Sequence, residues 1–160
     1  MGEPAPGFTL PGTPAGRPYR LADRRGRVVV LVFYPHDDTP VCTTQLVAYT
    51  AGLDRFAGLG ADVLAISPQD IAAHEGFARR HGIGFPLLSD VDKAVGRAYG
   101  VVGPLGYYKR SVFVVDPRGT VHYAHRSPHG LTYRPTDELC LLYTSPSPRD
   151  ISGSRMPSSA

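Results

Sequence analysis

An uninterrupted apolar run, Val28 to Tyr34, constrains the fold of this chain more than any other segment. The run does not alternate with polar residues, which is typical of a central strand that is covered on both faces. It ends at Pro35, and a helical spacing of apolar residues begins just after Cys42. A buried strand followed by an amphipathic helix predicts an α/β layered fold.

The other apolar patterns continue this order of strands and helices. Val63–Ile66 predicts a second buried strand, and Ser67–Asp70 opens a helix that Gly82 ends. The further expected elements are a hairpin of Phe8–Leu10 with Tyr19–Leu21, one helix from Cys42 to Phe56, an extended segment Phe85–Leu88, a helix Val91–Tyr99 capped by Asp90, and a hairpin of Val112–Val115 with Thr120–Tyr123. The fold class is therefore α/β, with a central mixed sheet flanked by helices.

The chain divides near Leu139 into one folded domain, residues 1–139, and a tail, residues 140–160. The tail is rich in Ser and Pro and shows no helical or strand period, so we expect it to be disordered. It also resembles the translation of a sequencing-library adapter, which would make it an artefact outside the fold. Pro135–Leu139 has the residues of a helix start, so we expect the C-terminal helix to be truncated.

The composition excludes several classes of function. The net charge of +3 comes from 17 basic and 14 acidic residues scattered along the chain, so we expect no nucleic-acid partner. No apolar run is long enough to span a bilayer, and no secretory signal is present, so we expect no membrane association. Two cysteines without such a signal indicate free thiols in a reducing cytosol, and the expected location is cytoplasmic.

Cys42 is the candidate reactive residue. The strand before it and the helix after it place its thiol in the first turn of a helix. Unpaired backbone N–H groups and the helix dipole stabilise a thiolate there, and a thiolate is a competent nucleophile. The alternative is that Cys42 is a small buried hydrophobic residue.

The segment around Cys42 resembles the active-site motif of the peroxiredoxins, Pro35-x-x-x-Thr39-x-x-Cys42, and is most similar to the bacterioferritin-comigratory, or peroxiredoxin Q, branch. Supporting matches occur at Gly2–Pro11, Phe85–Asp90 and Arg110–Asp116. The resemblance implies a thioredoxin-like fold and a thiol-dependent peroxidase that reduces hydrogen peroxide and organic hydroperoxides.

The resemblance also assigns roles to four residues. Cys42 would attack the peroxide and become a sulfenic acid. Arg110 would stabilise the thiolate and the charge on the departing oxygen; the alternative for Arg110 is a solvated charge at a strand edge. Thr39 would orient the peroxide through its hydroxyl group, or serve as a helix N-cap. Pro35, which has no N–H, would help to seal the pocket against water.

Two departures from the family pattern affect the expected cycle. Peroxiredoxins Q often carry a resolving cysteine where this chain has Val47, or near Arg80 or His81, and none of these is cysteine. A one-cysteine variant is implied, regenerated by an external thiol such as thioredoxin, glutaredoxin with glutathione, or a low-molecular-weight thiol. Gln45 stands where the family usually has glutamate, so a hydrogen bond to the arginine loses its charge assistance.

Other families or functions could also account for Cys42 and the residues around it. A one-cysteine branch similar to mycobacterial AhpE fits the absent resolving cysteine but fits Asp37-Asp38-Thr39 less well. A peroxide-sensing redox relay with low turnover needs the same thiol, whereas thioredoxin-type exchange needs a Cys-x-x-Cys pair that the chain lacks.

A metal site is the remaining alternative at this segment. The consecutive spacing of His36-Asp37-Asp38 sends the side chains in different directions, so we expect neither a metal nor a cofactor. The expected partners are a hydroperoxide and a thiol reductant, with the chain as a monomer or homodimer.

Overall fold

The computed structural model describes residues 3–36, 40–58 and 60–126, and within them the backbone but not the side chains of residues 40–42, 55 and 57. The strands are β1 (Thr9–Gly12), β2 (Arg17–Arg20), β3 (Val28–Phe33), β4 (Ala61–Ser67), β5 (Leu87–Ser89), β6 (Ser111–Val115) and β7 (Val121–Arg126). The helices are α1 (Pro40–Ala51), α2 (Leu53–Gly58), α3 (Ile71–His81) and α4 (Ala94–Ala98), with a 3₁₀ turn η1 (Leu21–Arg24). This element order confirms the expected α/β class.

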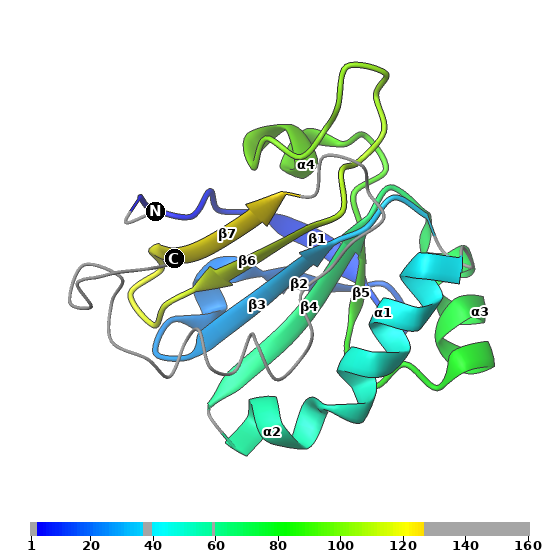
Figure 1. Cartoon of the computed structure of the whole chain (residues 1–160), viewed down its shortest axis with the longest axis horizontal. Coiled ribbons are helices and arrows are strands. Elements are labelled where there is room, and N and C mark those ends of the chain that lie inside the picture. The colour runs from blue at the N-terminus through cyan, green and yellow to red at the C-terminus, as the bar shows by residue number, and fades with distance from the viewer. Residues whose placement is uncertain (1–2, 37–39, 59, 127–160) are drawn as a thin grey trace.

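The strands form one mixed sheet in the order β2-β1-β5-β4-β3-β6-β7 (Figure 1). β3 runs parallel to β4, from Val28 opposite Ala61 to Phe33 opposite Ile66. β6 runs antiparallel to β3 on its other side, and Ser111 pairs with Phe33. The carboxyl end of β3 and the beginning of β6 therefore meet at the same edge of the sheet.

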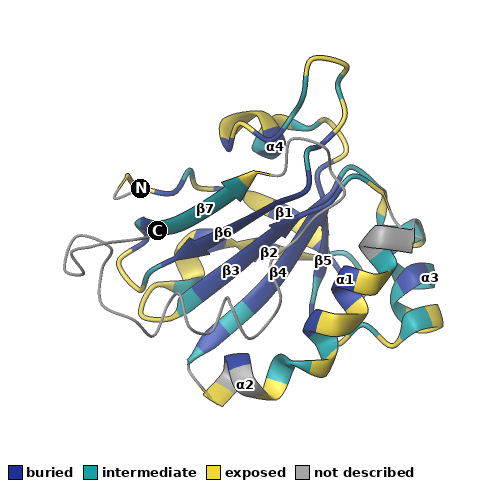
Figure 2. Cartoon of the chain, in the orientation of Figure 1, coloured by how far each residue is buried: buried dark blue, intermediate teal, exposed yellow. Residues whose placement is uncertain are grey.

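The central strand β3 is buried on both faces, as its unbroken apolar run predicts (Figure 2). Alternate side chains enter two different cores because successive residues of a strand point to opposite faces. Val29, Leu31 and Phe33 join the core that contains aromatic residues near α4, whereas Val30 and Val32 join the core covered by α1, α2 and α3. The helices thus lie on both faces of the sheet, as expected.

Two predicted helices differ from the observed ones. The single helix expected from Cys42 to Phe56 is wrong, because α1 ends at Ala51 and α2 begins at Leu53, with Gly52, a residue that weakens helices, between them. The helix expected over Val91–Tyr99 is shorter, because Lys93 has a left-handed backbone conformation with φ of 63° and α4 begins only after it. Both interruptions are local backbone events within otherwise correct segments.

The predicted ends of α3 and the predicted hairpin of β6 with β7 are confirmed. The carboxylate of Asp70 accepts a hydrogen bond from Ala73 N and caps α3, and Gly82 ends this helix with φ of 62°. The β6–β7 hairpin turns through Asp116, whose N–H donates to Thr120 O over 2.8 Å.

The predicted boundary near Leu139 and the predicted tail, residues 140–160, lie outside the described residues, as does the expected helix start at Pro135–Leu139. Within the described part of the chain, no helix has the length and apolar character that a membrane span requires.

Candidate active site

The candidate site lies where the carboxyl end of β3 meets the start of α1 and of β6. α1 begins at Pro40, so Cys42 is in its first turn, as the sequence predicts. Arg110 directly precedes Ser111, which pairs with the last residue of β3. Two segments that are distant in the sequence therefore meet at one edge of the sheet.

Cys42 is placed by its backbone only. Its side chain and the whole of Thr39 lie outside the described residues, so the roles of the thiol and of the threonine hydroxyl stay predictions. The amino-acid sequence of α1 contains no charged residue, so no side chain of this helix opposes a thiolate at its start. The first turn of such a helix favours a negative charge.

Arg110 is buried beside the same helix. Only 2% of its surface is exposed, and its Nη1 donates a hydrogen bond of 2.7 Å to Oε1 of Gln45, which is fully buried. Gln45 is one turn beyond Cys42 on α1, and residues at this spacing share a helix face. The alternative of a solvated charge at a strand edge is therefore wrong for Arg110.

Pro35 is half-buried and follows Tyr34, the buried residue that ends the apolar run. Tyr34 N donates to Ile66 O over 3.1 Å, and its hydroxyl group lies 3.4 Å from Nδ1 of His74. Nε2 of His74 lies 3.0 Å from Leu88 O. A carbonyl only accepts, so we assign the ring proton to Nε2, and Nδ1 accepts from the tyrosine. The segment that leads into the motif is thus tied to β4, α3 and β5.

The roles of His74 and Tyr34 in holding this segment were not predicted from the sequence. The available signal was the position of His74 three residues before Phe77, on the buried stripe of α3. A histidine on an apolar stripe needs hydrogen-bond partners inside the protein. The identity of those partners depends on tertiary contacts that the sequence does not display.

Asp90 holds the segment that precedes Arg110, through its bond to Tyr108. Its buried carboxylate accepts hydrogen bonds from Val95 N over 3.2 Å, from Gly96 N over 2.8 Å, and from the hydroxyl group of Tyr108. Burial, with the adjacent Asp90 carboxylate, raises the pKa of Tyr108 well above the usual range, so the hydroxyl group stays protonated and donates. The sequence predicts Asp90 as the cap of this helix, but the N-cap residue of α4 is Lys93. The Asp90 carboxylate still binds N–H groups in the first turn of α4, and its bond to Tyr108 adds a second role.

A metal site finds no support among the described residues, where no group of three or more His, Cys, Asp or Glu side chains could hold an ion. Asp37 and Asp38 lie outside the described residues. The chemistry of the described site is that of a buried guanidinium next to the helix that carries a cysteine.

Comparisons with known proteins agree with this arrangement. Residues 1–124 match the family model described as AhpC/TSA family. The chain is 38% identical over 128 residues to the chloroplastic peroxiredoxin Q of Oryza sativa subsp. japonica. This match covers 79% of this chain but only 58% of the rice protein. The chain is also 36% identical over 131 residues to peroxiredoxin Bcp of Xanthomonas campestris pv. campestris, and this match covers 77% of this chain and 82% of that protein.

A solved structure of Xanthomonas campestris bacterioferritin comigratory protein, studied for its alkyl peroxide reduction activity, has a TM-score of 0.77 with this chain. The two are 30% identical, and the match covers 86% of this chain and 90% of the other. This similarity confirms the thioredoxin-like fold that the sequence implied. The chain therefore belongs to the AhpC/TSA family, in its peroxiredoxin Q/Bcp branch.

Proposed function

We propose that this protein is a thiol-dependent peroxidase that reduces hydrogen peroxide and organic hydroperoxides through a sulfenic acid at Cys42. The observation that carries the proposal is the buried hydrogen bond of 2.7 Å from Arg110 to Gln45, which ties a guanidinium to α1 one turn beyond Cys42. The alkyl peroxide reduction described for the Xanthomonas campestris relative supports the same chemistry. The chain spans 58% of the plant relatives, so the activity is proposed for the matched domain.

The proposed reaction begins with the Cys42 thiolate, whose proton has been lost to solvent. Its sulfur attacks the terminal peroxide oxygen, so that an S–O bond forms as the O–O bond breaks. The departing oxygen takes a proton and leaves as water or an alcohol. The sulfur is oxidised by two electrons to a sulfenic acid, and the peroxide is reduced by the same two.

Three further residues have proposed roles in that step. Arg110 stabilises the thiolate before the attack and the negative charge on the departing oxygen during it. Thr39 orients the peroxide in line with the sulfur through its hydroxyl group. Pro35 lines the entrance without adding a competing N–H donor.

We propose a one-cysteine cycle for regeneration. Val47 is exposed on α1 and Arg80 is exposed on α3, and neither is the cysteine that a resolving role requires. An external thiol condenses with the sulfenic acid to a mixed disulfide and water, and a second thiol then releases the Cys42 thiol. Thioredoxin, or glutaredoxin with glutathione, would supply these thiols.

Single-turnover oxidation of Cys42→Ser tests the proposed nucleophile. The wild-type protein is expected to consume one equivalent of hydroperoxide with the loss of the Cys42 thiol, and Cys42→Ser is expected to consume none. Consumption at the wild-type level by Cys42→Ser would reject the mechanism. Cys140→Ser is the matched control, because it removes the chain's other cysteine.

Steady-state turnover with thioredoxin and its reductase tests the cycle. Wild-type protein and Cys140→Ser are expected to turn over alike. A Cys140→Ser protein that is oxidised once but no longer turns over would make Cys140 a resolving residue. We also propose a cytoplasmic location and a monomeric or homodimeric state, which cell fractionation and size-exclusion chromatography would test.

A further inference from the structure

Gln45 is a buried polar residue of α1 that binds Arg110 through one end of its amide group. Its Oε1 accepts the hydrogen bond from Arg110, while its Nε2 has no hydrogen-bond partner among the residues that the structure describes. The side chain is fully buried. A buried donor without an acceptor destabilises a fold, so packing and stability alone do not account for an amide here.

The orientation of the Gln45 amide is determined by Arg110. A guanidinium only donates hydrogen bonds, so the atom that faces it over 2.7 Å is the amide oxygen. Exchanging the amide oxygen and nitrogen would place two donors against each other. The unpartnered Nε2 is therefore a consequence of using an amide oxygen to hold the arginine.

We propose that Gln45 is a positioning residue that holds Arg110 in place without neutralising it, and thereby sets the acidity and peroxide reactivity of the Cys42 thiol. The inference rests on the proposed function. An amide oxygen accepts a hydrogen bond but carries no formal charge. A carboxylate in its place would form a buried ion pair with Arg110 and put a negative charge one helical turn from the thiolate. Charges in buried sites are screened little by water, so this difference is felt at the sulfur.

Gln45→Glu tests the proposal with almost no change in side-chain shape. We expect the variant to raise the thiol pKa by about one pH unit, because a like charge disfavours the thiolate. At pH values well below the wild-type midpoint, the thiolate fraction and the rate constant for sulfenic acid formation should fall about tenfold. Above the new midpoint the rate should return to the wild-type value. The readouts are thiolate ultraviolet absorbance against pH and stopped-flow oxidation by hydroperoxide.

Gln69→Glu is the matched control, because Gln69 is the chain's other glutamine and lies between β4 and α3. It makes the same change in net charge without altering the hydrogen bond between Arg110 and Gln45. We expect its thiol midpoint to stay with the wild type. An equal shift in both variants would mean that net charge alone acts, and would overturn the proposal.

Gln45→Met supplies an independent test if Gln45→Glu does not fold. Methionine fills a similar volume but cannot hold the guanidinium, so the rate should fall about tenfold or more at every pH rather than only at low pH. A folded Gln45→Met protein with the wild-type rate overturns the inference, as does a Gln45→Glu midpoint that is unchanged or lowered. If Cys42→Ser itself still consumes hydroperoxide, the proposed function fails instead.

Discussion

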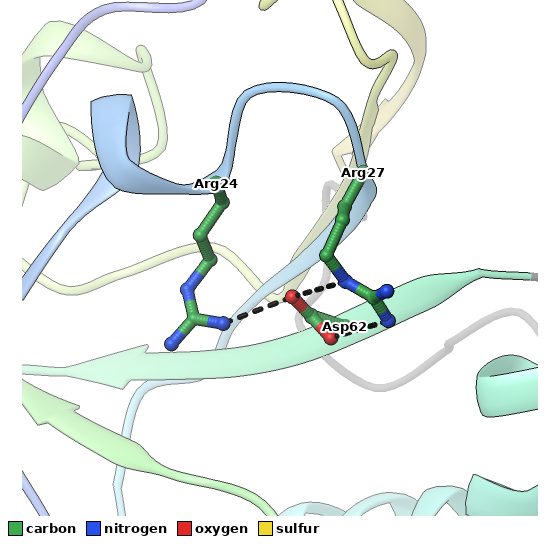
Figure 3. A network of polar contacts seen from close by, with 3 residues as sticks. All are labelled: Arg24, Arg27 and Asp62. Atoms are coloured by element: carbon green, nitrogen blue, oxygen red, sulfur yellow. Dashed lines mark hydrogen bonds and ion pairs between the residues drawn. The ribbon is translucent and has the colours of Figure 1, made fainter.

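Two arginine-containing networks lie at opposite ends of β3, and they differ in exposure and in the partner of the arginine. At the amino end, Arg24 and Arg27 both bind the carboxylate of Asp62, with Nη1 of Arg24 and Nη2 of Arg27 each 2.9 Å from it (Figure 3). Exposed fractions of these side chains range from 22% to 48%. At the carboxyl end, Arg110 is 2% exposed and binds the neutral amide of Gln45.

The difference separates an arginine network with a structural role from the arginine for which we propose a chemical role. The Asp62 carboxylate offsets the charge of its arginines, and water screens what is left, so this network joins the η1 segment to β4 at little gain or cost. A buried guanidinium costs much more to desolvate, and the amide of Gln45 carries no charge that would itself offset it. We propose that the charge of Arg110 acts on the Cys42 thiolate, since both lie beside the start of α1.

Substituting an arginine of each network should give the largest difference between them. Arg110→Met is expected to lower the rate constant of Cys42 oxidation by roughly 10²–10³, the usual effect of removing one electrostatic stabiliser of a developing anion. Arg27→Met, the matched control at the other end of β3, is expected to keep the wild-type rate. Stopped-flow oxidation with hydrogen peroxide measures both, and comparable rates for the two variants would contradict the distinction.

The hydrogen bond from Tyr108 to Asp90, which holds the segment before Arg110, should have a smaller effect, and on the stability of the fold. Tyr108→Phe removes the hydroxyl group that donates to the buried Asp90 carboxylate, and it should cost about 1–3 kcal/mol of unfolding free energy. Tyr107→Phe is the control, because Tyr107 is 71% exposed and Tyr108 only 4%. Its change should stay within about 0.5 kcal/mol. Urea denaturation compares the pair, and equal losses would show that the buried bond to Asp90 contributes nothing.

Features of the fold that depend only on residues close together in the sequence were predicted correctly. The bounds of β3 follow from its apolar run, and the ends of α3 follow from Asp70 and Gly82. The break at Gly52 and the left-handed Lys93 were missed, because a glycine or a lysine within a helical pattern is compatible with a continuous helix.

The candidate site was predictable only in part. The position of Cys42 followed from the order of strand and helix, whereas Arg110 was found through its resemblance to a family motif and not through its spacing from Cys42. The bonds from Arg110 to Gln45, from Tyr108 to Asp90 and from Tyr34 to His74 join elements that are distant in the sequence. Pairing of this kind depends on sheet order and register, which no local pattern specifies.

The exposed network of Arg24, Arg27 and Asp62 is expected to contribute little to stability, and its contribution should depend on pH. Partial burial acts to raise the pKa of Asp62, but the hydrogen bonds and charges of Arg27 and Arg24 outweigh it and hold this pKa below its ordinary value of 3.8. A lowered pKa means that the stabilisation is present above that value and is lost as the pH falls through the folded-state pKa. Asp62→Asn should therefore cost about 1 kcal/mol or less at neutral pH and nothing in strong acid.

Salt distinguishes this contribution from a packing effect of the Asp62 substitution. The two ion pairs face water, so added salt should shrink the difference between the wild type and Asp62→Asn. Thermal unfolding of both proteins at neutral and acidic pH, with and without salt, measures it. A difference that persists unchanged in acid would mean that Asp62 acts through packing rather than charge, and the contrast with the buried Arg110 would then rest on burial alone.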